Sequence, residues 1–82
     1  SQFIQNSIKV YPNPAKDYFV VEGDFIEEAE IHIFNSIGQE VFIVFSVKAG
    51  HIEFNTTNAP KGLYFVSIKR GRTTITEKII IE

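Results

Sequence analysis

The chain has 82 residues, of which 44% are hydrophobic and 22% are charged, a composition typical of one small globular domain. Its formal net charge of −2 is too small to indicate a nucleic acid or an anionic membrane surface as a partner. The absence of cysteine excludes disulfide bonds and thiolate metal sites.

The chain begins with "SQFIQNS", which lacks the basic region and apolar stretch of a signal peptide. We therefore expect Ser1 to follow a cut from a longer chain, residues 1–7 to be the remnant of a linker, and residues 8–82 to form a single β-sandwich. The longest uncharged apolar run, residues 41–47, is shorter than the about 20 residues of a membrane-spanning helix.

From residue 8 onward, alternating apolar residues and β-branched runs predict strands, and turn-forming residues separate them. Seven strands are expected, at residues 8–11, 18–22, 30–35, 40–46, 51–55, 63–69 and 74–81. The regular spacing of the turns is typical of a β-sandwich or barrel. No stretch sustains a helical pattern, although Asp24 could cap a single turn.

The stretch "YPNPAKD" predicts a rigid corner between the first two strands. Pro12 and Pro14 each fix φ and remove a backbone donor, and each favours an extended residue before it. Asn13 can bond the backbone in an Asx turn. The corner is structural, because nothing in it is reactive.

The strand faces can be assigned in part. Tyr64, Val66 and Ile68 share one face. Residues 41–45 are apolar on both faces, which predicts a central strand or one with an outer contact. Phe42 and Phe65 therefore either form a partly exposed apolar patch or pack under loops.

Candidates for chemistry are few. His32 and His51 have no cysteine and no carboxylate at a ligand-like spacing, so we expect exposed strand positions and no metal. An acidic cluster allows either a calcium site or, as we prefer, a solvated loop, and it comprises Glu22, Asp24, Glu27, Glu28 and Glu30. No serine has a GxSxG context. We expect no catalytic, cofactor-binding or metal-binding residues.

Three stretches together resemble one known family, the C-terminal sorting domain of the type IX (Por) secretion system of Bacteroidota. "YPNPAKDYFVV" is similar to its opening strand, Pro-Asn-Pro corner and second strand, and "AEIHIFNSIGQEV" is similar to its central hairpin. "APKGLYFVSI", followed later by "EKIIIE", is similar to its Gly-x-Tyr strand and lysine-plus-aliphatic terminus. One departure is Ala59, where the family usually has a larger aliphatic residue, and we expect weaker local packing there.

The resemblance implies an all-β fold, an immunoglobulin-like seven-stranded antiparallel β-sandwich, in agreement with the strand count. It also implies a secretion signal that directs a cargo protein from the periplasm across the outer membrane to the cell surface or the medium. The implied partners are the outer-membrane translocon, a shuttle protein, a sortase that often removes the domain, and the cargo domains of the parent chain. The resemblance implies no enzymatic activity.

The residues that match the family's motifs are the candidates for recognition by the translocon and sortase. They are Pro12, Asn13 and Pro14 in the corner, Gly38, Gln39 and Val41 in the central hairpin, Gly62 and Tyr64 in the late strand, and Lys78, Ile79, Ile80, Ile81 and Glu82 at the end. Several also have an explanation in the fold, because Gly38 suits a turn and Val41 and Tyr64 can be buried.

The last strand has two interpretations. Residues 78–82 either offer backbone hydrogen bonds and alternating aliphatic side chains to a receptor, by β-augmentation, or form a sealed edge. An uncovered terminal strand could also pair with a second copy of the chain.

The alternative function is a carbohydrate-binding or adhesive immunoglobulin-like module of a multidomain secreted hydrolase. Such modules generally present exposed aromatic side chains, often tryptophan, and the chain has no tryptophan. An inert spacer is a third hypothesis. An enzyme has the least support, because no acid–base pair or activated nucleophile is present.

Overall fold

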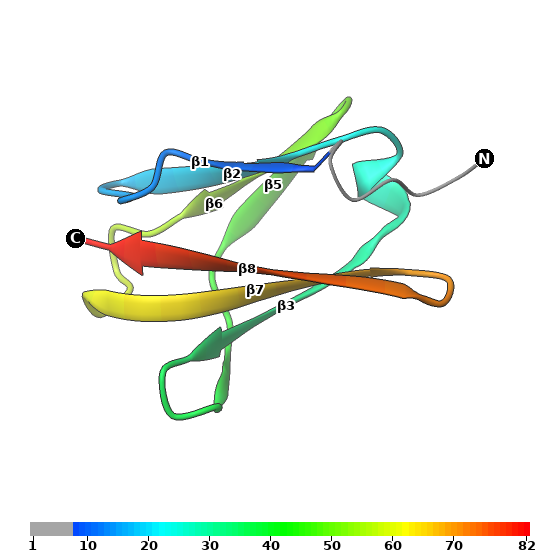
Figure 1. Cartoon of the computed structure of the whole chain (residues 1–82). Coiled ribbons are helices and arrows are strands. Elements are labelled where there is room, and N and C mark those ends of the chain that lie inside the picture. The colour runs from blue at the N-terminus through cyan, green and yellow to red at the C-terminus, as the bar shows by residue number, and fades with distance from the viewer. Residues whose placement is uncertain (1–7) are drawn as a thin grey trace.

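The computed structural model describes residues 8–82, which form two four-stranded antiparallel sheets facing one another (Figure 1). One sheet has the strand order β1-β2-β6-β5, and the other has the order β4-β3-β7-β8. The elements are β1 (Lys9–Tyr11), β2 (Tyr18–Glu22), the 3₁₀ turn η2 (Ile26–Glu28), β3 (Glu30–Asn35), β4 (Glu40–Val41), β5 (Phe45–Lys48), β6 (His51–Asn55), β7 (Gly62–Arg70) and β8 (Thr73–Ile81). The all-β prediction is confirmed. The linker expected at residues 1–7 lies outside the described residues.

The hydrophobic core lies between the two sheets, because alternate residues of each strand point to the same face. On β7 the predicted inner face is confirmed, since Tyr64, Val66 and Ile68 are all buried. From the other sheet, Phe19 and Phe54 stack with their ring centroids 4.8 Å apart. These side chains join the two sheets into one packed unit.

The strand predicted at residues 40–46 is in fact two strands that belong to different sheets. β4 pairs with β3, whereas β5 pairs with β6 on the opposite side of the core. The intervening chain crosses between the sheets, with Ile43 buried and Phe42 and Val44 exposed at 80% and 63%. The apolar residues on both faces therefore mark a crossover and not a central strand. The structure has eight strands in the described residues instead of the predicted seven.

The β7–β8 hairpin, with its basic turn, is held against the segment that contains η2. The Arg70 guanidinium donates to Glu28 Oε1 at 2.9 Å and lies over the Phe25 ring, 5.1 Å from its centroid. Gly71 at the tip has a φ of 62°, a conformation that glycine adopts without strain. A single helical turn does follow Asp24, as η2, but its N-cap residue is Phe25 and no side chain caps it, so Asp24 does not have the predicted capping role.

Within residues 8–82, no helix has both the length and the apolar character needed to cross a membrane.

Candidate functional site

The Pro-Asn-Pro corner lies against the end of β8. The Asn13 side chain bridges two backbone groups of that strand: its Nδ2 donates to the Lys78 carbonyl at 3.1 Å, and its Oδ1 accepts from the Ile80 N–H at 3.0 Å. The amide thus pairs with the strand as a neighbouring strand's backbone would. The Tyr11–Pro12 and Asn13–Pro14 peptide bonds are both cis.

Ala15 continues this pairing with its own backbone. Its N–H donates to the Ile80 carbonyl and its carbonyl accepts from the Glu82 N–H, both at 2.7 Å. These bonds form a parallel bridge between Ala15 and Ile81. The Ala15 side chain is fully buried in the core, so the corner is held by packing as well as by hydrogen bonds.

The outer edge of β8 is therefore occupied along residues 78–82. The Lys78 carbonyl, both backbone groups of Ile80, and the Glu82 N–H all have partners in the corner. Of the two interpretations of the last strand, the sealed edge describes the domain in this structure. A receptor strand could pair with this edge only after the corner moves away.

The side chains of the last strand alternate between core and solvent. Ile79 and Ile81 are buried, whereas Ile80 is 45% exposed and both Lys78 and Glu82 are exposed. Since residues i and i+2 share a face, the side chains of Lys78, Ile80 and Glu82 all lie on the outer surface. Of residues 78–82, only these three have side chains exposed on the surface of the domain.

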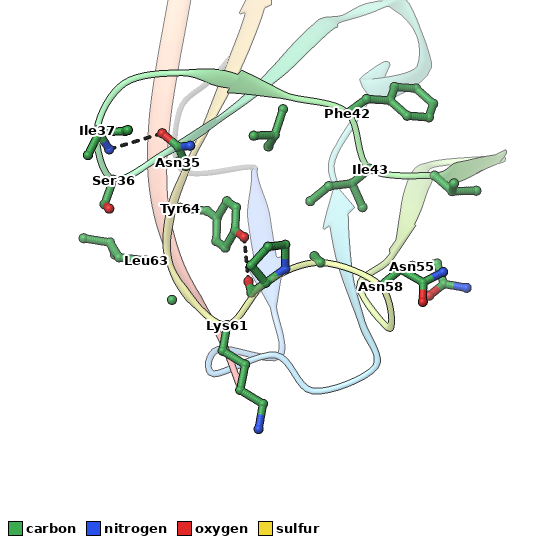
Figure 2. A pocket seen from close by; sticks show the side chains of 15 residues that line it. Asn35, Ser36, Ile37, Phe42, Ile43, Asn55, Asn58, Lys61, Leu63 and Tyr64 are labelled. Carbon is green, nitrogen blue, oxygen red and sulfur yellow. Dashed lines mark hydrogen bonds between the residues drawn. The ribbon is translucent and has the colours of Figure 1, made fainter.

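A groove of about 440 Å³ opens between the β3–β4 hairpin, the crossover and the loop before β7 (Figure 2). Figure 2 shows Tyr64 and Ile43 directed toward the groove and Phe42 and Lys61 directed away from it. The predicted site residues Val41, Gly62 and Tyr64 line it. Gly62 and Tyr64 are also the register partners of Ile81 and Ile79, so the groove and the last strand share one end of β7.

The β3–β4 turn next to the groove is organised by one side chain. Asn35 Oδ1 accepts from the backbone N–H groups of Ile37 and Gln39, at 3.2 and 2.9 Å, and its Nδ2 donates to Gln39 Oε1 at 3.0 Å. Gly38 has a φ of 85°, which a residue with a Cβ adopts only with strain. Asn35 was not among the predicted site residues, although an asparagine three residues before a turn glycine is a recognisable signal.

Tyr64 closes the base of the groove, where its hydroxyl donates to the Pro60 carbonyl at 2.5 Å. We expect Tyr64→Phe to lower the free energy of unfolding by about 1–2 kcal/mol, because a part-buried carbonyl loses its partner while the packing is retained. Chemical denaturation followed by far-UV circular dichroism measures the change. Tyr18→Phe is the control, because Tyr18 is exposed, and a cost equal to that of Tyr64→Phe would contradict the role of the bond.

Comparison with known protein families gives a match. A model of the family described as "Secretion system C-terminal sorting domain" matches residues 9–82, nearly the whole chain. The chain belongs to this family. No curated protein and no solved structure matches it. The sorting domain is thus a C-terminal signal for type IX secretion, and its cargo is exported across the outer membrane to the cell surface or the extracellular space.

The sorting domain brings its predicted recognition residues into two neighbouring groups. Residues 12–14 contact residues 78–82 through the hydrogen bonds of Asn13, although 65 residues separate Asn13 from Lys78. Gly38, Gln39, Val41, Gly62 and Tyr64 lie in or beside the groove. That these residues contact the translocon or the sortase stays a prediction. Ala15 was not anticipated, because the sequence gives no sign that a lone alanine bridges the two sheets.

The two phenylalanines singled out in the sequence differ in environment. Phe42 is 80% exposed on the crossover and lies edge-on to Phe45, with ring centroids 6.4 Å apart. Phe65 is only half-buried, on the outer face of β7, opposite Phe34 in the strand register. The exposed patch is thus centred on Phe42.

Most titratable groups of the acidic segment have separate partners. The Tyr11 hydroxyl donates to Glu22 at 2.6 Å, and Arg70 pairs with Glu28. Across residues 8–82, no group of three histidine, cysteine, aspartate or glutamate side chains is arranged to hold a metal ion. Within the described residues, Glu22 and Glu28 of the acidic segment thus have individual side-chain partners.

His32 has carboxylate partners that the sequence analysis did not anticipate. Its Nε2 lies 2.6 Å from Glu30 Oε2, and its Nδ1 lies 2.5 Å from Glu40 Oε2 on the edge strand β4. These hydrogen bonds, that of Glu30 first, raise the pKa of His32, and the bond to His32 lowers the pKa of Glu30. Glu30 precedes His32 by two residues, the spacing that places both on one face of a strand.

We expect the His32 contacts to make stability depend on pH. A raised histidine pKa stabilises the fold fully below the ordinary value of 6.5, and this contribution is lost as the pH rises through the folded-state pKa. Glu30 behaves in the opposite way. Its lowered pKa stabilises the fold above pH 4.5, and this stabilisation is lost as the pH falls through the folded-state pKa. The melting temperature should therefore fall as the pH rises above about 6.5, because the raised pKa of His32 is passed in that direction.

His32→Gln should flatten that fall, because glutamine does not titrate. His51→Gln is the matched control, since the His51 side chain forms no hydrogen bond with another described residue. Thermal melts at several pH values measure the difference. Equal flattening by both substitutions would contradict the assignment.

Proposed function

We propose that the sorting domain acts by direct contact with the outer-membrane translocon, its shuttle protein and a sortase, and that the sortase removes it from many cargo molecules. The domain lies in the periplasm during transit, attached to the cargo part of its parent chain. The match to the family across residues 9–82 is the observation that carries this proposal. In this proposal the sorting domain has no catalytic role of its own, because the sortase performs the cleavage and the parent chain of the domain is its substrate.

The proposed recognition residues are those predicted from the motifs. Some of them would contact the partner directly, and the others would maintain the shape of the surface. Lys78, Ile80 and Glu82 present exposed side chains, so they are the candidates for direct contact. The buried Ile79, Ile81 and Tyr64 support that surface from within. Pro12, Asn13 and Pro14 hold the edge of the last strand.

We further propose that the fold is immunoglobulin-like. What supports this is the strand order: β1-β2-β6-β5 corresponds to strands A-B-E-D, and β3-β7-β8 corresponds to C-F-G. The short β4 then takes the place of an additional C′ strand. No observation favours the carbohydrate-binding alternative.

A fusion experiment tests the function. An inert passenger with an N-terminal export signal is joined to the sorting domain and expressed in a bacterium with a type IX system. We expect the passenger at the cell surface or in the medium only when both the domain and the translocon are present. Equal delivery without the domain, or retention in the periplasm with it, would contradict the proposal.

A further inference from the structure

We propose that the Pro-Asn-Pro corner is a displaceable cover on the binding edge of β8, and that an extended strand of the export machinery replaces it at residues 78–82. This inference rests on the proposed function and adds to it a mechanism of engagement. It predicts that the corner and the partner strand exclude one another, because both require the same four backbone groups of β8.

The chemistry of the occupant follows from what the edge already binds. Asn13 and Ala15 satisfy outward-facing N–H and C=O groups in alternation, as a paired strand does. Any extended backbone can make the same bonds, and this is the basis of strand addition. The replacing strand must also fill the fully buried space that Ala15 occupies, so we expect a small apolar residue at that position.

The edge of β8 beside the corner, at Thr74 and Thr76, provides a starting point for a partner strand. The backbone N–H and C=O groups of successive residues in an edge strand point in alternate directions. Those of Thr74 and Thr76 therefore point away from β7, as those of Ile80 do. Within residues 8–82, no backbone hydrogen bond reaches this part of the edge, and both threonines are exposed. A partner strand can therefore pair first beside Thr74 and Thr76 and then extend toward Glu82 as the corner leaves.

A reversible lock tests the displacement. Ala15 and Ile81 are partners in a parallel bridge, and neighbouring strands lie about 4.8 Å apart, within the Cα range of a disulfide. The chain has no other cysteine, so Ala15→Cys with Ile81→Cys forms one defined bond that fastens the corner to β8. The two single cysteine variants are the matched controls, and free-thiol titration reports closure of the lock.

The locked domain is fused to the inert passenger and its surface delivery is compared with that of the single variants. We expect the lock to reduce delivery at least about tenfold relative to either single variant, while the purified locked domain keeps a cooperative melt. Delivery equal to that of the single variants would overturn the displacement. Failure of the unmodified fusion to be delivered would instead overturn the proposed function.

A second variant keeps the inference testable if the locked pair misfolds. Asn13→Ala removes two bonds from the corner and leaves both prolines, so the Ile80 amide should exchange with deuterium about tenfold faster. Surface delivery should then start sooner, by at least about twofold. Lys48→Ala, at an exposed position of β5 in the other sheet, should change neither quantity. A folded Asn13→Ala domain that is delivered more slowly would show that the corner is itself recognised, and would overturn the inference.

Discussion

Replacing Ile79 by alanine is expected to lower the free energy of unfolding by about 2–5 kcal/mol, the usual cost of truncating a buried isoleucine. Ile79 is fully buried and lies in register with the buried Tyr64 of β7. The loss therefore includes contacts with the neighbouring strand as well as apolar burial. For a domain of 82 residues this is a large part of the total stability.

The matched control is Ile80→Ala, the same substitution one residue along the strand. Ile80 is 45% exposed on the outer face, so its truncation should cost less than about 1 kcal/mol. Urea denaturation of both purified variants measures the difference. Similar costs for the two would contradict the assigned alternation of β8.

The different burial of Ile79 and Ile80 decides how residues 78–82 should be tested for a role in secretion. Deleting residues 78–82 would remove two buried isoleucines together with the partners of the corner. Loss of export would then follow from unfolding as readily as from loss of a signal. Substitution of Ile80, Lys78 or Glu82 separates the two, because their side chains lie outside the core.

The sequence predicted most of the strands, because alternation of apolar residues reflects which face is buried. It was wrong where the same apolar pattern had another cause. Residues 42–44 are apolar because the chain passes from the edge of one sheet to the edge of the other, and a crossover and a buried strand give the same pattern. Only the pairing partners of β4 and β5 distinguish them.

The sequence predicts a set of candidate site residues, and it does not predict how they are arranged. The motifs identified the corner and the last strand separately, and nothing local indicates that Asn13 bonds Lys78 and Ile80. Pairs of this kind depend on how the sheets face one another, which no single stretch determines. The carboxylates around His32 are similar, since the Glu40 contact requires the β3–β4 pairing.

Introducing a charge at Ala15 is expected to have the second large effect. The side chain is fully buried in the hydrophobic core, so Ala15→Asp places a carboxylate among apolar side chains. We expect the free energy of unfolding to fall by roughly 3 kcal/mol or more. Burial would raise the pKa of the new carboxyl, so that it is protonated in the folded domain. The loss should be smaller at acid pH, where the carboxyl is also neutral in the unfolded chain and its protonation no longer costs free energy.

Lys16→Asp is the control for this change, because it introduces the same side chain at the next, exposed position. The Lys16 backbone carbonyl accepts from the Thr56 hydroxyl at 3.0 Å, a bond that the substitution leaves in place. Denaturation at neutral and acid pH should separate the two variants clearly. If Ala15→Asp were as stable as Lys16→Asp, the corner would not be packed into the core, and its hold on β8 would depend on the exposed hydrogen bonds alone.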